Sequence, residues 1–297
     1  MDKTKKRKEN LIILDASILK VGTGQKKEES KKTIPNSIFF DLKNVFLNKD
    51  GQFPNTIPTQ NHFEEEVRKL GINKDSCVVV YDDLGVYSSP RAWWLFKLFG
   101  FKNVAVLNGG LPAWKENNYP IEFLSLKESQ QGSFTAVFQK ELLCKTDNVL
   151  LASNNKQMIL DARSKERFYA TVPEPRKDLR GGHIPNSKSL PYTELQVDGK
   201  MKYKEELQKV FSILNPHNKK VIFSCGSGIT ACILALANEI IGNTNLDSSP
   251  IELTPLQAGE LFQGDLAYIF KSKIIKHLKF PIIPNEKFVP ELFIWNQ

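Results

Sequence analysis

The feature that most constrains the fold of this chain is an internal repeat. The segment LIILDAS returns as MILDAR, with an offset of 146 residues between Asp15 and Asp161. The tetrapeptide IPNS occurs at residues 34–37 and again at 184–187, an offset of 150. A third pair, CVVVYD and KVIFSC, is offset by 143 residues. Three landmarks in the same order at nearly constant spacing predict two copies of one fold.

Each copy alternates short runs of Val, Ile and Leu with helix-forming stretches. In the first copy VVVYD and VAVLNGG flank the stretch SPRAWWLFKLFG, and in the second VIFSC precedes TACILALANEIIG, which ends at Gly242. Continuous apolar strands joined by helices are typical of parallel sheets covered on both faces. The sequence therefore predicts an α/β protein of two tandem domains, each a mostly parallel sheet flanked by helices.

The expected domains follow from the repeat and from local composition. A chain of 297 residues, 41% of them hydrophobic, can bury two cores. We expect one domain over residues 8–125 and a second over residues 146–297. The stretch between them, 126–145, is polar and lacks a sustained hydrophobic period, as linkers do.

Charge and composition argue against several classes of function. The net charge is +8, but the lysines are scattered among glutamates and form no stripe interleaved with aromatic residues, so no nucleic acid partner is expected. No run of 18 apolar residues predicts a membrane span. The four cysteines include no CxxC pair, which favours free thiols in a reducing compartment. We expect a cytoplasmic protein, with the mitochondrion as the alternative, and no metal or cofactor, because no His/Cys cluster has ligand spacing.

The strongest chemical signal in the sequence is Cys225, which directly follows the predicted strand VIFS of the second copy. In α/β sheets, ligands gather at the carboxyl ends of the strands. Glycines in the loop allow successive N–H groups to point into one cradle, and the following helix adds positive potential there. A cysteine in that cradle is expected to be a thiolate nucleophile and to tolerate a persulfide. The predicted loop comprises Cys225, Gly226, Ser227, Gly228, Ile229 and Thr230.

The other cysteines are expected to be structural. A single cysteine is most often a small buried hydrophobe, and this applies to Cys77 and Cys144. Cys232 lies seven residues beyond Cys225 on the apolar helix, so it should pack in the core. Thr230 could donate a hydrogen bond to the substrate or cap the helix, and both interpretations stay open at this point.

The loop CGSGIT resembles the active-site loop of two-domain rhodanese-like sulfurtransferases, in particular the 3-mercaptopyruvate sulfurtransferases. The resemblance extends from about residue 11 to residue 242 and includes LDAR, GGHIPNS, YDDLGVYSSPRAWWLFKLFG and LNGGLPAW. It implies that the N-terminal copy is catalytically silent, and Asp82 stands there at the position of Cys225. It also implies that sulfur moves through a Cys225 persulfide to a thiol acceptor such as thioredoxin, or to cyanide.

The resemblance further implies substrate-binding roles for Arg167 and Arg176, in RFYATVPEPR, and for the loop residues after Cys225. A guanidinium fork matches a carboxylate and stays charged, although Arg167 could instead form an ion pair with Glu166 or Glu174. Family members often carry an Asp and a His in the N-terminal domain, but those positions fall near Lys43 and Asn55, so this relay is not carried over. Residues 243–297 match nothing in the family, and the last strand of the second sheet is expected to be replaced or poorly ordered.

Three other functions remain open from the sequence. Thiosulfate sulfurtransferases resemble Cys-Arg-Lys-Gly-Val-Thr, whereas this loop is neutral at Gly226 and Ser227. A cysteine phosphatase would need an Arg at the sixth position after Cys225, which is Ala231. A non-catalytic sulfur carrier or binding module is the third. The homologous copies could satisfy each other's interface, which favours a monomer.

Overall fold

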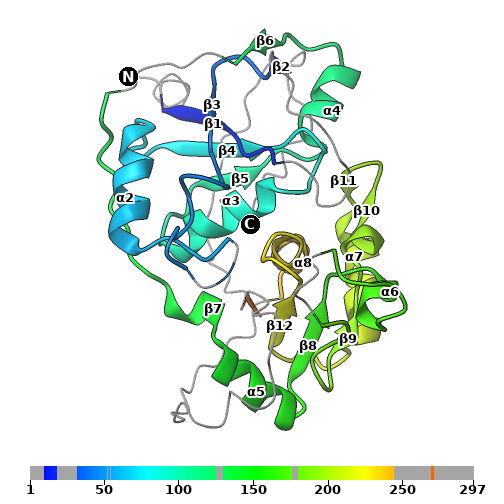
Figure 1. Ribbon diagram of the computed structural model, residues 1–297. Helices are drawn as coiled ribbons and strands as arrows, with labels where there is room; N and C mark the ends of the chain where they lie inside the picture. Colours follow the sequence, from blue (N-terminus) through cyan, green and yellow to red (C-terminus); the bar gives the residue numbers. More distant parts are fainter. Residues whose placement is uncertain are drawn as a thin grey trace. The chain divides into compact units, whose positions relative to one another are not determined.

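The computed structural model describes residues 10–18, 32–51, 53, 55–124, 130–175 and 180–243, together with the backbone of 269–270 (Figure 1). The chain divides into two compact units between Gln139 and Lys140, with residues 198–200 grouped with the first unit. Each unit contains its own sheet. In the part of the chain that is described, no helix is long and apolar enough to cross a membrane.

The first unit is built on a four-stranded sheet in the order β3-β1-β4-β5. Its strands are β1 (Leu11–Asp15), β3 (Ser37–Phe39), β4 (Cys77–Tyr81) and β5 (Val104–Val106), and all of its pairings are parallel. The register aligns Asp15 with both Phe39 and Tyr81, so three strands end at one edge. A small separate pair joins β2 (Lys32–Thr33) and β6 (Glu122–Phe123) in antiparallel fashion.

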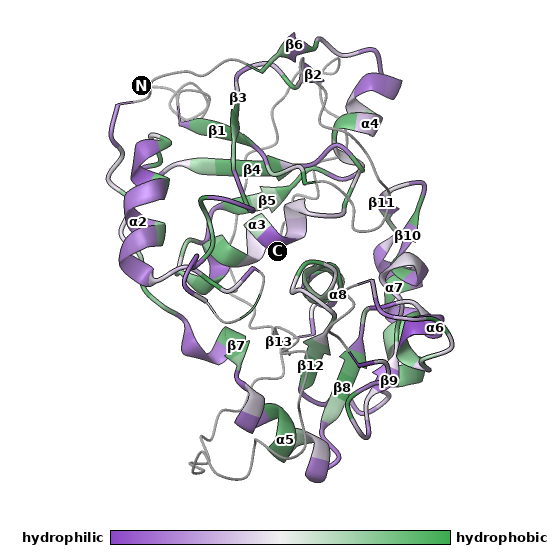
Figure 2. Cartoon of the chain, in the orientation of Figure 1, coloured by the Kyte–Doolittle hydropathy of each residue, from purple (hydrophilic) through white to green (hydrophobic). Residues whose placement is uncertain are grey.

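Three α-helices accompany this sheet: α2 (Gln60–Lys69), α3 (Ser89–Leu98) and α4 (Gly110–Glu116). Every residue of α3 is buried, whereas α2 buries Phe63 and Val67 and exposes polar side chains. Figure 2 shows that α2 is largely hydrophilic, whereas the strands β4 and β5 are hydrophobic. The aromatic rings of Phe63 and Phe99 stack at a centroid distance of 4.4 Å and form the centre of this core.

The expected linker, residues 126–145, is described from residue 130; its residues 130–139 are attached to the first unit, and its residues 140–145 belong to the second. Phe134 is 2% exposed and lies edge-on to Phe63 and Phe101. Backbone hydrogen bonds run from Gly132 to Arg68 and from Phe134 to Ile72, and Val137 and Gln139 are bonded to the end of α3. Residues 130–139 are therefore ordered against the first core, although they contain no helix or strand of their own.

The second unit contains a five-stranded sheet in the order β7-β13-β12-β8-β9. Its strands are β7 (Leu143–Cys144), β8 (Met158–Asp161), β9 (Lys188–Ser189), β12 (Val221–Ser224) and β13 (Ile269–Phe270). The remaining elements are η1 (Lys140–Leu142), α5 (Thr146–Asn154), α6 (Lys165–Phe168), η2 (Tyr192–Leu195), β10 (Gln196–Val197), β11 (Lys200–Met201), α7 (Lys204–Leu214) and α8 (Ala231–Ile240).

The two sheets repeat one topology, which confirms the predicted α/β class. The parallel set β9-β8-β12 matches β3-β1-β4, and Asp161 pairs with Ser224 as Asp15 pairs with Tyr81. The sheets differ at their next strand, where β13 pairs with β12 in antiparallel fashion while β5 is parallel to β4. This replacement of the last strand is the departure expected within 243–297, most of which lies outside the described residues.

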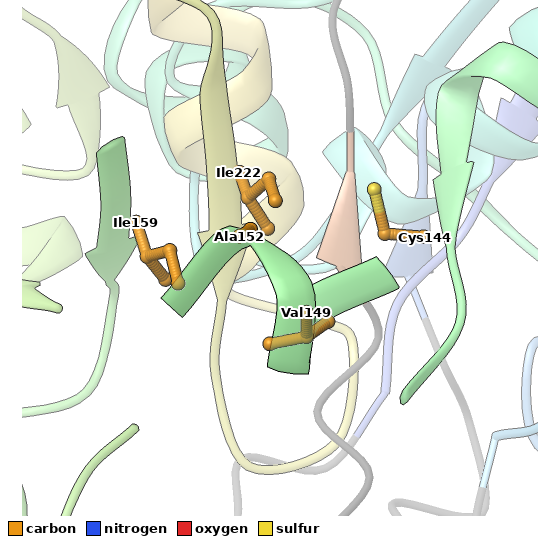
Figure 3. Packing of buried hydrophobic residues seen from close by; sticks show 5 residues of the cluster. All are labelled: Cys144, Val149, Ala152, Ile159 and Ile222. Atoms are coloured by element: carbon orange, nitrogen blue, oxygen red, sulfur yellow. The ribbon is translucent and has the colours of Figure 1, made fainter. Parts of the chain in front are cut away.

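The core of the second unit includes a cluster of buried apolar side chains. Val149 and Ala152 of α5 lie with Ile159 of β8, Ile222 of β12 and Cys144 of β7. Figure 3 shows these side chains on their elements, with the sulfur of Cys144 as the one polar atom among them. The prediction that Cys144 is a buried hydrophobe is therefore confirmed.

Candidate active site at the cysteine loop

Cys225 follows β12 directly and lies at the carboxyl end of the parallel strands. Its neighbour Ser224 is in register with Asp161, the last residue of β8, so the loop begins where two strands end. The Cys225 side chain is 3% exposed and accepts a hydrogen bond at its sulfur from the backbone N–H of Gly228, at 3.1 Å. A donor aimed at sulfur stabilises a thiolate or the negative charge of a persulfide.

The two glycines of the loop differ in what a side chain would meet at their positions. Gly228 has a φ of +74°, a conformation that costs other residues energy, and this conformation accompanies the N–H bond to Cys225. Gly226 is not among the residues with positive φ. A β-carbon at residue 226 would instead lie 2.8 Å from Nη2 of Arg167, which is too close for a real contact. A side chain at position 226 would therefore require the Arg167 guanidinium to shift away from the loop.

The rest of the loop leads into α8. Ile229 is buried at 3% exposure, and Ser227 is partly exposed. Thr230 occupies the N-cap position of α8, but its side chain makes no capping hydrogen bond. The fully buried Cys232 thiol donates to the carbonyl oxygen of Gly228 at 3.3 Å, so this core cysteine also contacts the loop.

Arg167 projects from the short helix α6, which begins after Ser164. The Ser164 hydroxyl accepts a hydrogen bond from the Arg167 amide and so caps the helix. The guanidinium lies against the loop at Gly226 and is at the same time paired with Glu174. The ion pair with Glu174, one of the two interpretations of Arg167 that the sequence left open, is therefore present, and the same guanidinium lies near Gly226.

The Glu174 carboxylate is hydrogen-bonded to two arginines, Arg163 and Arg167. Its carboxylate accepts hydrogen bonds from Nε of Arg167 at 3.1 and 3.3 Å, from Nη2 of the same residue, and from Nη1 of Arg163 at 3.0 Å. Arg163 in turn donates to both oxygens of Asp161 and to the carbonyl oxygen of Gly182 at 2.6 Å. The four side chains form a continuous series of alternating charge.

Electrostatics keep Arg163 charged inside the protein. Burial alone would lower the pKa of Arg163, but the hydrogen bonds and charge of Asp161, the charge of Glu174 and that of Cys225 raise this pKa above its ordinary value. Cys225 is thus within electrostatic reach of the Arg163 guanidinium. Sequence reasoning named Glu174 only as a possible ion-pair partner and did not single out Arg163, because buried charge contacts have no local motif. One signal existed, since the repeat has Ser17 where the second copy has Arg163.

The remaining candidate residues near Arg167 in the sequence have no described contact with the cysteine loop. Arg176, the second predicted carboxylate ligand, lies outside the described residues. The His183 ring stacks on Phe168 at 3.9 Å, and its Nδ1 is bonded to the Phe168 carbonyl at 2.9 Å, as expected for a structural residue. Within the described residues, no cluster of His, Cys, Asp or Glu is arranged to hold a metal ion.

The equivalent loop of the first unit already holds an anion of its own. Asp82 follows β4 as Cys225 follows β12, and it is fully buried. Its carboxylate accepts the Ser89 hydroxyl at 2.6 Å and backbone N–H bonds of 2.8–3.0 Å from Leu84, Tyr87, Ser88 and Ser89. Burial raises the pKa of Asp82, and the hydrogen bonds from Ser89 oppose that rise. In this loop, backbone N–H groups form a cradle around the Asp82 carboxyl group, whereas Cys225 accepts a backbone N–H bond from Gly228.

We expect Asp82→Asn to destabilise the protein by about 2–4 kcal/mol, because an amide nitrogen would face N–H donors that now bond to a carboxylate oxygen. Asp83→Asn, at the exposed neighbouring position, is the matched control and should change the free energy of unfolding by less than about 0.5 kcal/mol. Urea denaturation of both variants measures the difference. Equal effects of the two substitutions would mean that the cradle does not need an anion.

Comparison with known proteins identifies the family. The rhodanese-like domain family matches residues 3–117 and 146–246, which together are most of the chain. This chain belongs to the rhodanese-like domain family. Its two rhodanese-like domains correspond to the repeat in the sequence and to the duplicated sheet, and the recognised resemblance is confirmed.

Individual relatives of this rhodanese-like chain are sulfurtransferases. The 3-mercaptopyruvate sulfurtransferase of Escherichia coli is 39% identical over 206 residues, covering 69% of this chain and 73% of the relative. The thiosulfate sulfurtransferase of Rattus norvegicus is 34% identical over 249 residues, covering 80% and 82%. The crystal structure of Escherichia coli SseA, described as a 3-mercaptopyruvate sulfotransferase with the rhodanese fold, has a TM-score of 0.71 at 34% identity and covers 81% of this chain and 94% of that chain. These comparisons support sulfurtransferase activity.

Lys43 and Asn55 lie near the two positions of the first domain at which the resemblance implies an Asp and a His. They contact each other, since Lys43 Nζ donates to Asn55 Oδ1 at 2.9 Å. The backbone oxygen of Asn55 also accepts from the buried Arg91 at 2.8 Å. Asn55 is thus part of the packed structure of the first unit, whereas Lys43 is exposed.

Proposed function

We propose that this rhodanese-like protein transfers sulfur from 3-mercaptopyruvate through a persulfide on Cys225. The observation that carries the proposal is the approach of the Arg167 guanidinium to the cysteine loop at Gly226. A small donor with a carboxylate a few bonds from its sulfur can then reach the thiolate and a cation together. The homology to 3-mercaptopyruvate sulfurtransferases supports the same donor.

The proposed reaction has two half-reactions. The Cys225 thiolate attacks the sulfur of 3-mercaptopyruvate, an S–S bond forms, and the C–S bond breaks with its electron pair on the carbon of the pyruvate enolate. The proton of the donor thiol passes in net to that carbon, which leaves pyruvate and the persulfide anion. An acceptor thiolate such as that of thioredoxin, or cyanide, then attacks the outer sulfur and restores the Cys225 thiolate.

The parts of the loop have assigned roles in this proposal. The N–H of Gly228 points at the Cys225 sulfur and stabilises its negative charge. Arg167 holds the donor carboxylate, and Arg176 is proposed to do the same. Ser227 and Thr230 lie on the partly exposed side of the loop, where their hydroxyls can donate to donor oxygen or to the outer sulfur.

The activity is tested with purified protein, 3-mercaptopyruvate or thiosulfate as donor, and a thiol or cyanide as acceptor. We expect stoichiometric pyruvate and sulfide or thiocyanate, with a higher kcat/KM for 3-mercaptopyruvate than for thiosulfate. The reverse preference would indicate a thiosulfate sulfurtransferase, in line with the relative from Rattus norvegicus. Binding without turnover would indicate a non-catalytic sulfur carrier.

Ser227→Lys is expected to shift donor preference. A cation beside the thiolate attracts thiosulfate, whose charge lies close to the transferred sulfur, more than it attracts 3-mercaptopyruvate. We expect the ratio of kcat/KM for thiosulfate to that for 3-mercaptopyruvate to rise about tenfold, equivalent to about 1.4 kcal/mol. The companion change Gly226→Arg is less suitable, because its side chain would displace Arg167. An unmoved ratio in a folded, active Ser227→Lys enzyme would show that loop charge does not set donor choice.

A further inference from the structure

The series Asp161–Arg163–Glu174–Arg167 becomes more exposed only at its last member. The side chains of Asp161, Glu174 and Arg163 are 2%, 1% and 9% exposed, whereas that of Arg167 is 25% exposed. Three buried charges thus lead to one accessible cation, and that cation lies against the cysteine loop. Arg167 is therefore accessible to a ligand, whereas Asp161, Arg163 and Glu174 are buried.

The hydrogen bonds of Arg167 divide its guanidinium into an occupied edge and an open edge. Glu174 takes Nε and Nη2, as a bidentate carboxylate does. Among the described residues, no hydrogen bond from Nη1 is recorded. A planar guanidinium that is fixed along one edge presents its remaining donors in a fixed direction.

We infer that Glu174 is a positioning residue, which orients the open edge of Arg167 for the carboxylate of the sulfur donor; the inference rests on the proposed function. Glu174 touches no reacting atom and acts through Arg167. Its own charge would weaken the attraction of Arg167 for an anion, but Arg163 bonds to the same carboxylate and offsets that charge. Asp161 in turn balances Arg163, so the four side chains together carry no net charge, and Arg167 acts through the fixed direction of its free donors.

The repeat indicates that this series serves the site and is not a requirement of the fold. The first unit has the same strand and turn, but Ser17 replaces Arg163. Both turns form the same local bond, from the Ser17 amide to Asp15 at 3.0 Å and from the Arg163 amide to Asp161 at 2.9 Å. The turn therefore forms with a serine, and the arginine is present in the copy that carries Cys225.

Glu174→Ala and Glu174→Gln test the inference by donor discrimination. We expect kcat/KM for 3-mercaptopyruvate to fall about 10- to 100-fold, and that for thiosulfate, which has no carboxylate, to fall by less than about threefold. Glu174→Gln keeps the side-chain volume and one acceptor oxygen, so it provides the test if the alanine variant does not fold. Glu166→Gln, on the exposed side of α6, is the matched control and should leave both donors unaffected. Equal losses on both donors would overturn the inference.

A second readout does not depend on sulfur transfer. Iodoacetate and iodoacetamide alkylate the same thiol, but only iodoacetate carries a carboxylate, so the ratio of their rates at Cys225 reports the anion site. We expect Glu174→Gln to lower this ratio about tenfold, with Cys77 as an internal reference resolved by peptide mass spectrometry. An unchanged ratio overturns the inference. If wild type formed no persulfide from 3-mercaptopyruvate while the ratio still fell, the proposed function would fail and the role of Glu174 would stand.

Discussion

Cys225→Ser is expected to reduce sulfur transfer from 3-mercaptopyruvate to the rate without enzyme. An alkoxide is far scarcer than a thiolate near neutral pH, and an oxygen nucleophile cannot form a persulfide. The backbone donor from Gly228 remains in place, so the loss should come from chemistry and not from unfolding. Pyruvate release under saturating donor measures the effect, and thermal unfolding confirms that the variant is folded.

Cys232→Ser is the matched control for the nucleophile. Cys232 lies in the first turn of α8, two residues after Thr230, and donates to the carbonyl oxygen of Gly228, which a serine hydroxyl can also do. We expect this variant to retain most of the activity. If Cys225→Ser kept full activity and Cys232→Ser lost it, Cys225 would not be the nucleophile.

Arg167→Ala should lower kcat/KM for 3-mercaptopyruvate by about one to two decades. Loss of a charge-assisted hydrogen bond costs about 1.5–3 kcal/mol, and each 1.4 kcal/mol is about tenfold in rate. Arg176→Ala is expected to have a loss of the same order. Thiosulfate lacks the carboxylate, so its kcat/KM should fall less in both variants. Steady-state kinetics with both donors gives the comparison.

Arg167→Lys separates recognition from stability. The alanine variant also removes a partner from the buried Glu174, which can destabilise the second unit. Lysine keeps the positive charge but cannot pair with Glu174 and the donor through two planar edges. We therefore expect an intermediate loss for 3-mercaptopyruvate with unfolding close to that of wild type. Losses of equal size on both donors would show that Arg167 supports the fold and does not bind the carboxylate.

The sequence predicted the duplicated fold and the place of the cysteine loop after a strand because both depend on short sequence patterns. LDA, IPNS and the apolar runs before Asp82 and Cys225 mark equivalent strands, and the sheets align these residues as expected. The glycines of CGSGIT were also informative, since Gly228 has the positive φ that such a turn uses. These features need only neighbours along the chain to be recognised.

The rest of the site depends on contacts between distant residues. The proximity of Arg167 to Gly226, nearly 60 residues away in sequence, is a contact that turn geometry does not predict. Glu174 became a central residue only because Arg163 and Arg167 both converge on it. The antiparallel β13 likewise has no counterpart in the first copy from which its direction could be predicted.

The central claim, a persulfide on Cys225, is tested most directly by intact-mass spectrometry of the protein after a single addition of 3-mercaptopyruvate without acceptor. The account predicts one added sulfur atom per chain, one pyruvate released, and localisation of the sulfur to the peptide that contains Cys225. A thiol acceptor should then remove the added mass. Pyruvate released with no sulfur on the protein, or sulfur found on another cysteine, would contradict the account.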